Sequence, residues 1–200
     1  MPEKQTDIVG CIAIDEPMSG ENRLSGLSCA PGLVVFPFEW RAGEDALGAL
    51  QTLLQRARSS CGAAAIVARG LGCLAALALA EQLPVDRLAL VEPRLGRLRG
   101  CGTLARCFNR IALFARQNLS LCVSDVLIVQ TGDTRAGRKL VSLGLGAHSR
   151  VARVELPAET APELYTICDN TLKTAVTDFL RGGDWPKDLA QNREMCIIYE

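Results

Sequence analysis

The sequence predicts a three-layer α/β fold, in which helices cover both faces of a mostly parallel sheet. Short β-rich runs alternate with helical stretches along the 200 residues, and strands separated by helices need the crossover connections of parallel pairing. The run 87–91 is apolar after its first residue, which is typical of a strand buried on both faces. The composition, with 48% hydrophobic and 22% charged residues, is that of a globular protein.

Six strands and five helices are expected, largely in alternation. The expected strands are short runs rich in apolar residues, and they cover 8–14, 32–38, 63–68, 87–91, 125–130 and 150–156. The expected helices carry apolar side chains at helical spacing, and they cover 44–58, 72–82, 103–118, 135–145 and 162–181. Glu44 and Asp45 suit the first turn of a helix, because negative charge is favourable there. The loop 15–32 is long and rich in turn formers, and such loops are often functional.

Composition and charge exclude several kinds of partner. The 22 basic and 22 acidic residues cancel, so no net charge attracts nucleic acid or an anionic membrane surface. The arginine-rich segment 87–116 suits a solvated helix face, and binding of an anion or an acidic partner is the alternative. Aromatic residues make up only 4% of the chain, which disfavours nucleic-acid recognition. One histidine, and nine cysteines without a C-x-x-C pair, argue against a metal or redox site. We therefore expect no metal, no cofactor and reduced thiols.

The chain is expected to form one domain over 1–182, followed by a C-terminal tail over 183–200. The polar segment 1–7 lacks the apolar region of a secretory signal, and Arg69 interrupts the longest apolar stretch. These features predict a cytoplasmic protein without a membrane span. A small-molecule ligand, a protein partner and a homo-oligomer are all compatible with the sequence.

Distinctive residues follow several of the expected strands, where ligands bind in an open parallel sheet. The run Phe36-Pro37-Phe38-Glu39-Trp40-Arg41 is close to an F-P-Y-D-W-R run, and the turn over 68–73 has the shape of a nucleophile elbow. The segment 126–133 matches a strand that ends at the acid of a catalytic triad, here Asp133. Together these features resemble the α/β-hydrolase fold of lipases, esterases and acyltransferases, and the resemblance covers roughly 7–181.

The sequence departs from this family at two catalytic positions. Gly70 stands at the nucleophile position and has no side chain that could attack. The loop 157–162, after the last expected strand, contains no histidine where the family has its base. The single histidine, His148, precedes that strand and is expected at the opposite edge of the sheet, roughly 20 Å away.

The resemblance therefore implies a degenerate hydrolase without Ser-His-Asp chemistry. Such a protein would bind a small molecule or act as a scaffold at the remnant elbow pocket, and whether catalysis survives by another route stays open. The predicted ligand-binding residues follow the third, fourth and fifth strands: Arg69, Gly70, Leu71, Gly72, Glu92 and Asp133.

The same glycine turn also fits a dinucleotide-binding fingerprint. Gly70-Leu71-Gly72-Cys73-Leu74-Ala75 matches G-x-G-x-x-A between a strand and a helix, and Glu92 ends the next strand. However, Ala68 and Cys73 stand where flavoprotein versions have glycine, and the fingerprint strand comes third in the chain. We keep nucleotide binding as the alternative function. Close packing of a helix on a strand would also explain both glycines.

Other nucleophiles are available, but each has a simpler structural interpretation. Cys73 lies in the first helical turn after the elbow, and we interpret it as a small residue packed under the turn. Ser25, Ser28 and Cys29 are expected at the same sheet edge as the elbow, without a histidine partner.

Three carboxylates, those of Glu39, Glu92 and Asp133, are expected at that edge as well. Such carboxylates can carry out acid–base chemistry without histidine. Pairing with Arg69, in particular by Glu39 or Glu92, is the simpler role.

Overall fold

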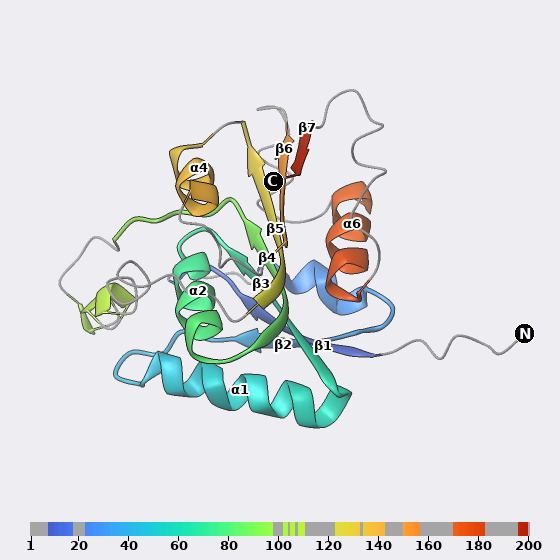
Figure 1. Cartoon of the computed structure of the whole chain (residues 1–200). Coiled ribbons are helices and arrows are strands. Elements are labelled where there is room, and N and C mark those ends of the chain that lie inside the picture. The colour runs from blue at the N-terminus through green and yellow to red at the C-terminus, as the bar shows by residue number, and fades with distance from the viewer. Residues whose placement is uncertain are drawn as a thin grey trace, which may run out of the picture.

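A seven-stranded sheet forms the centre of the computed structural model, which describes residues 8–17, 23–97, 102–103, 105–106, 108–110, 123–132, 134–142, 150–156, 170–182 and 196–199 (Figure 1). The strands are β1 (Val9–Ile14), β2 (Leu33–Phe38), β3 (Ala63–Arg69), β4 (Val85–Val91), β5 (Val123–Thr131), β6 (Arg150–Leu156) and β7 (Cys196–Tyr199). Their order across the sheet is β2-β1-β3-β4-β5-β6-β7. The first six strands are parallel, and β7 is antiparallel to β6.

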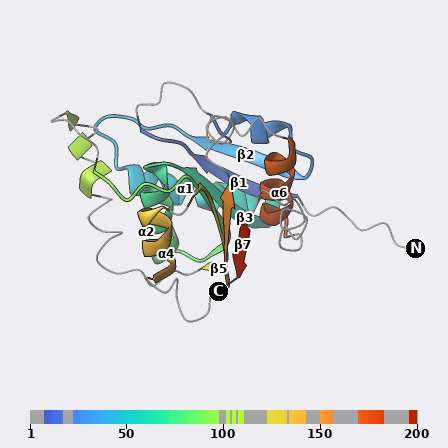
Figure 2. The same ribbon diagram turned by 90° about the horizontal axis from the view of Figure 1, so that it is seen from above.

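Helices cover both faces of the sheet, so the predicted three-layer α/β fold is confirmed (Figure 2). One face carries α1 (Ala46–Cys61), α2 (Gly72–Gln82) and α4 (Arg135–Ser142). The other face carries the 3-10 helix η1 (Ser25–Cys29) and α6 (Asn170–Leu180). Nine successive residues of α2 are buried, as expected of a helix that is apolar on all sides.

Two hydrophobic cores lie on the two faces of the sheet, because successive side chains of a strand point to opposite sides. Along β1, Ile12 and Ile14 join the core under α1 and α2. Cys11 and Ala13 instead join the core under η1 and α6. The central strands are buried on both faces, which confirms what the run 87–91 indicated.

Most predicted elements agree with the structure to within a few residues. The helix expected over 44–58 runs from Ala46 to Cys61 and ends at Gly62, whose φ of 78° stops it. Residues 103, 105–106 and 108–110 are helical, as expected, and 111–118 lie outside the described residues. Of the last expected helix, only 170–181 is described, and Asn170–Leu180 is helical.

One strand was not predicted. Cys196–Tyr199 lies in the segment expected to be a tail, yet it pairs with Ala152–Glu155 of β6 and extends the sheet. Within the described part of the chain, no helix has both the length and the apolar character needed to cross a membrane.

Candidate functional site

A sharp turn joins the carboxyl end of β3 to α2. Gly70 has a φ of 56°, which is the left-handed region that glycine adopts without steric cost. Its N–H donates to the Val91 carbonyl at 3.0 Å, and its own carbonyl accepts from the N–H of Arg94 at 3.0 Å. The described residues therefore contain the strand-turn-helix geometry of a nucleophile elbow, fixed by main-chain bonds to the segment after β4.

Gly72 has a packing role at the start of α2. A Cβ atom at this position would lie 2.7 Å from the carbonyl oxygen of Ile14 and 2.8 Å from that of Asp15. Both neighbours are backbone atoms that cannot move easily. Glycine at residue 72 thus allows α2 to approach the end of β1 closely.

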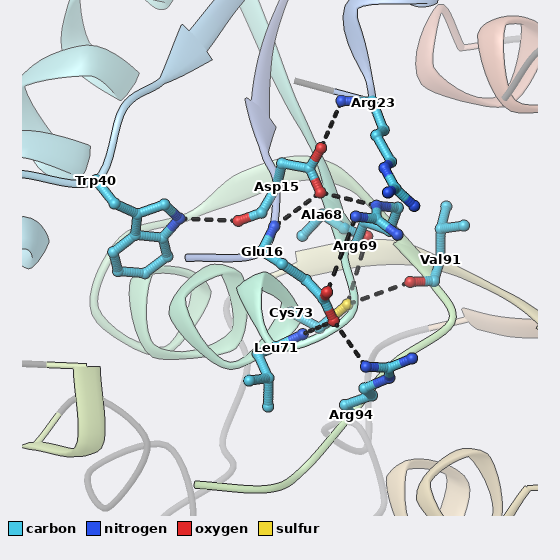
Figure 3. A network of polar contacts seen from close by, with 10 residues as sticks. All are labelled: Asp15, Glu16, Arg23, Trp40, Ala68, Arg69, Leu71, Cys73, Val91 and Arg94. Atoms are coloured by element: carbon cyan, nitrogen blue, oxygen red, sulfur yellow. Dashed lines mark hydrogen bonds and ion pairs between the residues drawn. The ribbon is translucent and has the colours of Figure 1, made fainter. Parts of the chain in front are cut away.

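A buried ion pair lies directly beside the turn (Figure 3). Arg69 is 2% exposed, and its Nε donates to Asp15 Oδ1 at 2.7 Å. The same carboxylate accepts from the N–H of Glu16 at 2.7 Å and from the N–H of Arg23 at 2.6 Å. Trp40 adds a hydrogen bond from its Nε1 to the Asp15 carbonyl at 2.8 Å. The pair thus meets the requirement that buried charges be paired and hydrogen-bonded.

The carboxylate of Glu16 lies directly over Gly70. Its Oε1 accepts from the N–H of Leu71 at 3.3 Å and lies 3.3 Å from Arg94 Nη1, while its Oε2 lies 3.9 Å from Arg69 Nη2. A Cβ atom at Gly70 would lie 1.9 Å from Glu16 Oε1. The carboxylate therefore fills the space into which a nucleophile at residue 70 would project.

The Cys73 thiol is buried beneath the same turn. Its Sγ lies 3.4 Å from the carbonyl oxygen of Ala68 and 3.8 Å from that of Val91. Burial raises the pKa of Cys73 above its ordinary range, because the thiolate would lose its hydration. A neutral, inaccessible thiol is a poor nucleophile, which agrees with the predicted packing role.

Glu92 connects the ends of β4 and β5. Its backbone has a φ of 46°, which is uncommon for a residue with a side chain. Its Oε1 accepts from both the N–H and the hydroxyl of Thr131, each at 2.6 Å. These two bonds fix the carboxylate beside the carboxyl edge of the sheet.

Five of the six predicted site residues come together at this edge, namely Arg69, Gly70, Leu71, Gly72 and Glu92. Asp133 and His148 lie outside the described residues. The predicted pairing of Arg69 with Glu39 or Glu92 is wrong, since Arg69 pairs with Asp15 and Glu16.

Glu39 directly follows β2, at the carboxyl edge where it was expected, and its side chain is 73% exposed and pairs with Arg41. The expected position of Cys29 is wrong. Cys29 was expected near the elbow, but it lies just before β2, whose first residue, Leu33, bonds to the Ala30 carbonyl. The exposed Cys29 thiol is therefore nearer the amino end of the sheet.

Asp15 and Glu16 belong to this site but were not predicted from the sequence. The register of the parallel pair β1 and β3 sets Ile14 beside Ala68, so the next residues along the two strands, Asp15 and Arg69, are also neighbours. An acidic pair after one strand and an arginine after another predict an ion pair only when the two strands are known to be neighbours in the sheet.

Comparison with known proteins bears on the fold of the chain. No protein-family model matches the chain, and no match was found among curated proteins. A solved structure from Xanthomonas campestris pv. campestris, named as a "putative hydrolase of the alpha/beta superfamily", superposes with a TM-score of 0.51 and 14% identity. The match covers 88% of this chain and 99% of that one. The chain has an α/β-hydrolase-like fold.

The contacts at the turn do not favour the dinucleotide-binding alternative. A pyrophosphate would have to approach the N–H groups at the start of α2, where the Glu16 carboxylate already accepts from Leu71. The Glu92 carboxylate, expected to bind a ribose, is bonded to Thr131 instead. Across the described segments, no cluster of three or more metal-ligating side chains of the His, Cys, Asp or Glu type occurs.

Proposed function

We propose that this chain is a hydrolase-fold protein without serine-hydrolase chemistry, which uses the carboxyl edge of its sheet to bind a small molecule or to serve as a scaffold. The observation that carries the proposal is the Glu16 carboxylate over Gly70. It fills the nucleophile position, and Gly70 supplies no attacking atom of its own.

The oxyanion hole supports the same conclusion. In elbow hydrolases, one N–H of the hole comes from the residue after the nucleophile and another from the loop after an early strand. The matching groups here are the N–H of Leu71, which donates to Glu16, and the N–H of Glu16, which donates to Asp15. Both donors are bonded to negative carboxylates. A developing oxyanion would meet repulsion where catalysis needs stabilisation.

Intact-mass analysis with a fluorophosphonate probe tests the proposal, together with turnover of p-nitrophenyl esters. We expect no adduct and no turnover above the uncatalysed rate. The exposed Cys29 thiol could react with activated esters, so Cys29→Ala is the matched control that removes this background. A covalent adduct, or ester turnover that survives Cys29→Ala and is lost in Glu16→Gln or Glu92→Gln, would overturn the proposal.

A further inference from the structure

Two guanidinium groups and one backbone N–H surround the carboxylate of Glu16. The N–H of Leu71 and Nη1 of Arg94 each lie 3.3 Å from Oε1, and Nη2 of Arg69 lies 3.9 Å from Oε2. Leu71 directly precedes α2, where the N–H groups of a helix start favour an anion. Arg69 is 2% exposed, so its charge is screened less by water than a surface charge.

Glu16 is held more loosely than the neighbouring Asp15. The three donors to Asp15 lie at 2.6–2.7 Å, whereas the contacts of Glu16 span 3.3–3.9 Å. Charge-assisted bonds of good geometry are about 2.7–2.9 Å long. The Glu16 side chain is also 21% exposed and that of Arg94 is 54% exposed, against 7% for Asp15. Solvent can therefore reach Glu16 and its partner Arg94.

The Glu16 carboxylate occupies the space that a side chain at residue 70 would need. A Cβ atom there would lie 1.9 Å from Oε1, 2.4 Å from Cδ and 2.5 Å from Cγ of Glu16. The space over the turn exists because residue 70 has no side chain. If the Glu16 side chain left this space, a small carboxylate could enter it.

The charges favour an anion with a single negative charge. Asp15 bonds to Arg69 through its Nε, and Glu16 lies closest to Arg94. Without the Glu16 carboxylate, the guanidinium group of Arg94 and the N–H of Leu71 lose this acceptor. A planar monoanion replaces both the charge and the shape of the Glu16 carboxylate.

We propose that Leu71, Arg69 and Arg94 form a binding site for a small carboxylate, which Glu16 occupies from within the chain and which an external carboxylate can take over. This inference rests on the proposed function, because a carboxylate bound over Gly70 leaves no room for a nucleophile. It names monocarboxylates as the class of small molecule that the site accepts.

Titration with sodium acetate tests the site, with sodium chloride and sodium phosphate as comparisons at constant ionic strength. The readout is the amide resonance of Leu71 in ¹⁵N-labelled protein, supported by thermal unfolding. We expect Glu16→Ala to bind acetate saturably, and the wild-type chain to bind it more weakly because Glu16 competes. Glu16→Ala combined with Arg94→Ala should lose affinity by about tenfold or more.

Three results would overturn the inference. They are equal responses to acetate and chloride in Glu16→Ala, tighter binding of phosphate than of acetate, and unchanged affinity when Arg94 is removed. If Glu16→Ala does not fold, the acetate titration of the wild-type chain tests the site instead. A Leu71 amide resonance that does not shift with acetate would then contradict the proposed site. The fluorophosphonate experiment separates the two proposals. Without an adduct and without acetate binding, only the carboxylate site fails, whereas an adduct contradicts the proposed function itself.

Discussion

Burial determines the chemistry of the cysteine side chains. Among those described, Cys11, Cys29, Cys61 and Cys73 are free thiols, and Cys11 and Cys73 are fully buried. Burial raises the pKa of Cys11 to about 12 and moves that of Cys73 in the same direction. Both thiols are thus neutral in the folded protein at pH values where they would ionise in an unfolded chain.

The raised pKa values predict that the protein loses stability in alkaline solution. A thiol of the unfolded chain ionises near pH 9.0, so its contribution is fully present below that pH and is lost as the pH rises from 9 toward 12. We expect the unfolding free energy to fall by about 1.4 kcal/mol per pH unit for each buried thiol. Urea unfolding between pH 8 and pH 11 measures this slope.

Cysteine variants show which thiol causes the decrease of the unfolding free energy with pH. Cys11→Ala and Cys73→Ala should each make the decrease shallower than in the wild-type chain. Cys29→Ala is the matched control, because it removes an exposed thiol instead of a buried one. A slope that is the same in all four proteins would refute the assignment.

At the scale of elements, the close contact between Gly10 of β1 and Ala57 of α1 determines where the helix lies on the sheet. A Cβ atom at Gly10 of β1 would lie 2.9 Å from Ala57 Cβ and 3.0 Å from the Ala57 carbonyl oxygen. The glycine and the small alanine together allow the helix to lie close to the strand.

Gly10→Ala should therefore force α1 away from β1 and destabilise the fold by about 1–3 kcal/mol, the usual cost of overpacking. Gly102→Ala is the matched control, because a Cβ atom there has no neighbour within 4 Å among the residues that the structure describes. Thermal unfolding of both variants measures the difference. If Gly10→Ala is as stable as Gly102→Ala, the close contact does not position the helix.

The Asp15–Arg69 pair joins β1 to β3, and it can be tested by a double-mutant cycle. Removing one partner leaves an uncompensated buried charge, so Arg69→Met and Asp15→Asn should each cost about 3–5 kcal/mol of unfolding free energy. The double variant should lose less than the sum of the two. Arg41→Met and Glu39→Gln, which break an exposed pair, should leave stability essentially unchanged. Additive losses at Asp15 and Arg69 would contradict direct coupling.

The same elements show how far the sequence predicts this structure. The six parallel strands and the elbow-like turn were predictable, because each strand is a local apolar run and the turn is marked by Gly70 and Gly72. The partner of Arg69 was not predictable. Along the chain β2 lies between β1 and β3, whereas in the sheet β1 and β3 are neighbours. The ion pair follows from strand order, which local patterns do not contain.

At the scale of the whole molecule, the sheet protects its two edges differently. The N–H of Val9 donates to the carbonyl of Gly32, which directly precedes β2. Along β2, the backbone polar groups of every second residue therefore point toward β1. Those of Val35 and Pro37 point outward, away from β1. Proline has no N–H, which leaves this edge with few donors for pairing with another chain. The opposite edge of the six parallel strands is covered by β7. This strand was missed because four residues are too short a run for a periodic signal.

Deleting residues 196–200 should therefore expose β6 as a free edge. Ala152–Glu155 would lose their partners in β7, and we expect amide exchange along β6 to accelerate by about tenfold or more, since each lost hydrogen bond is worth roughly 1 kcal/mol. Hydrogen exchange with mass spectrometry measures this, and the amides of β2 at the other edge are the internal control. Free edges also promote association, so sedimentation velocity should show larger species as the concentration rises. Unchanged exchange in β6, or equal acceleration in β2, would mean that β7 does not cover this edge in solution.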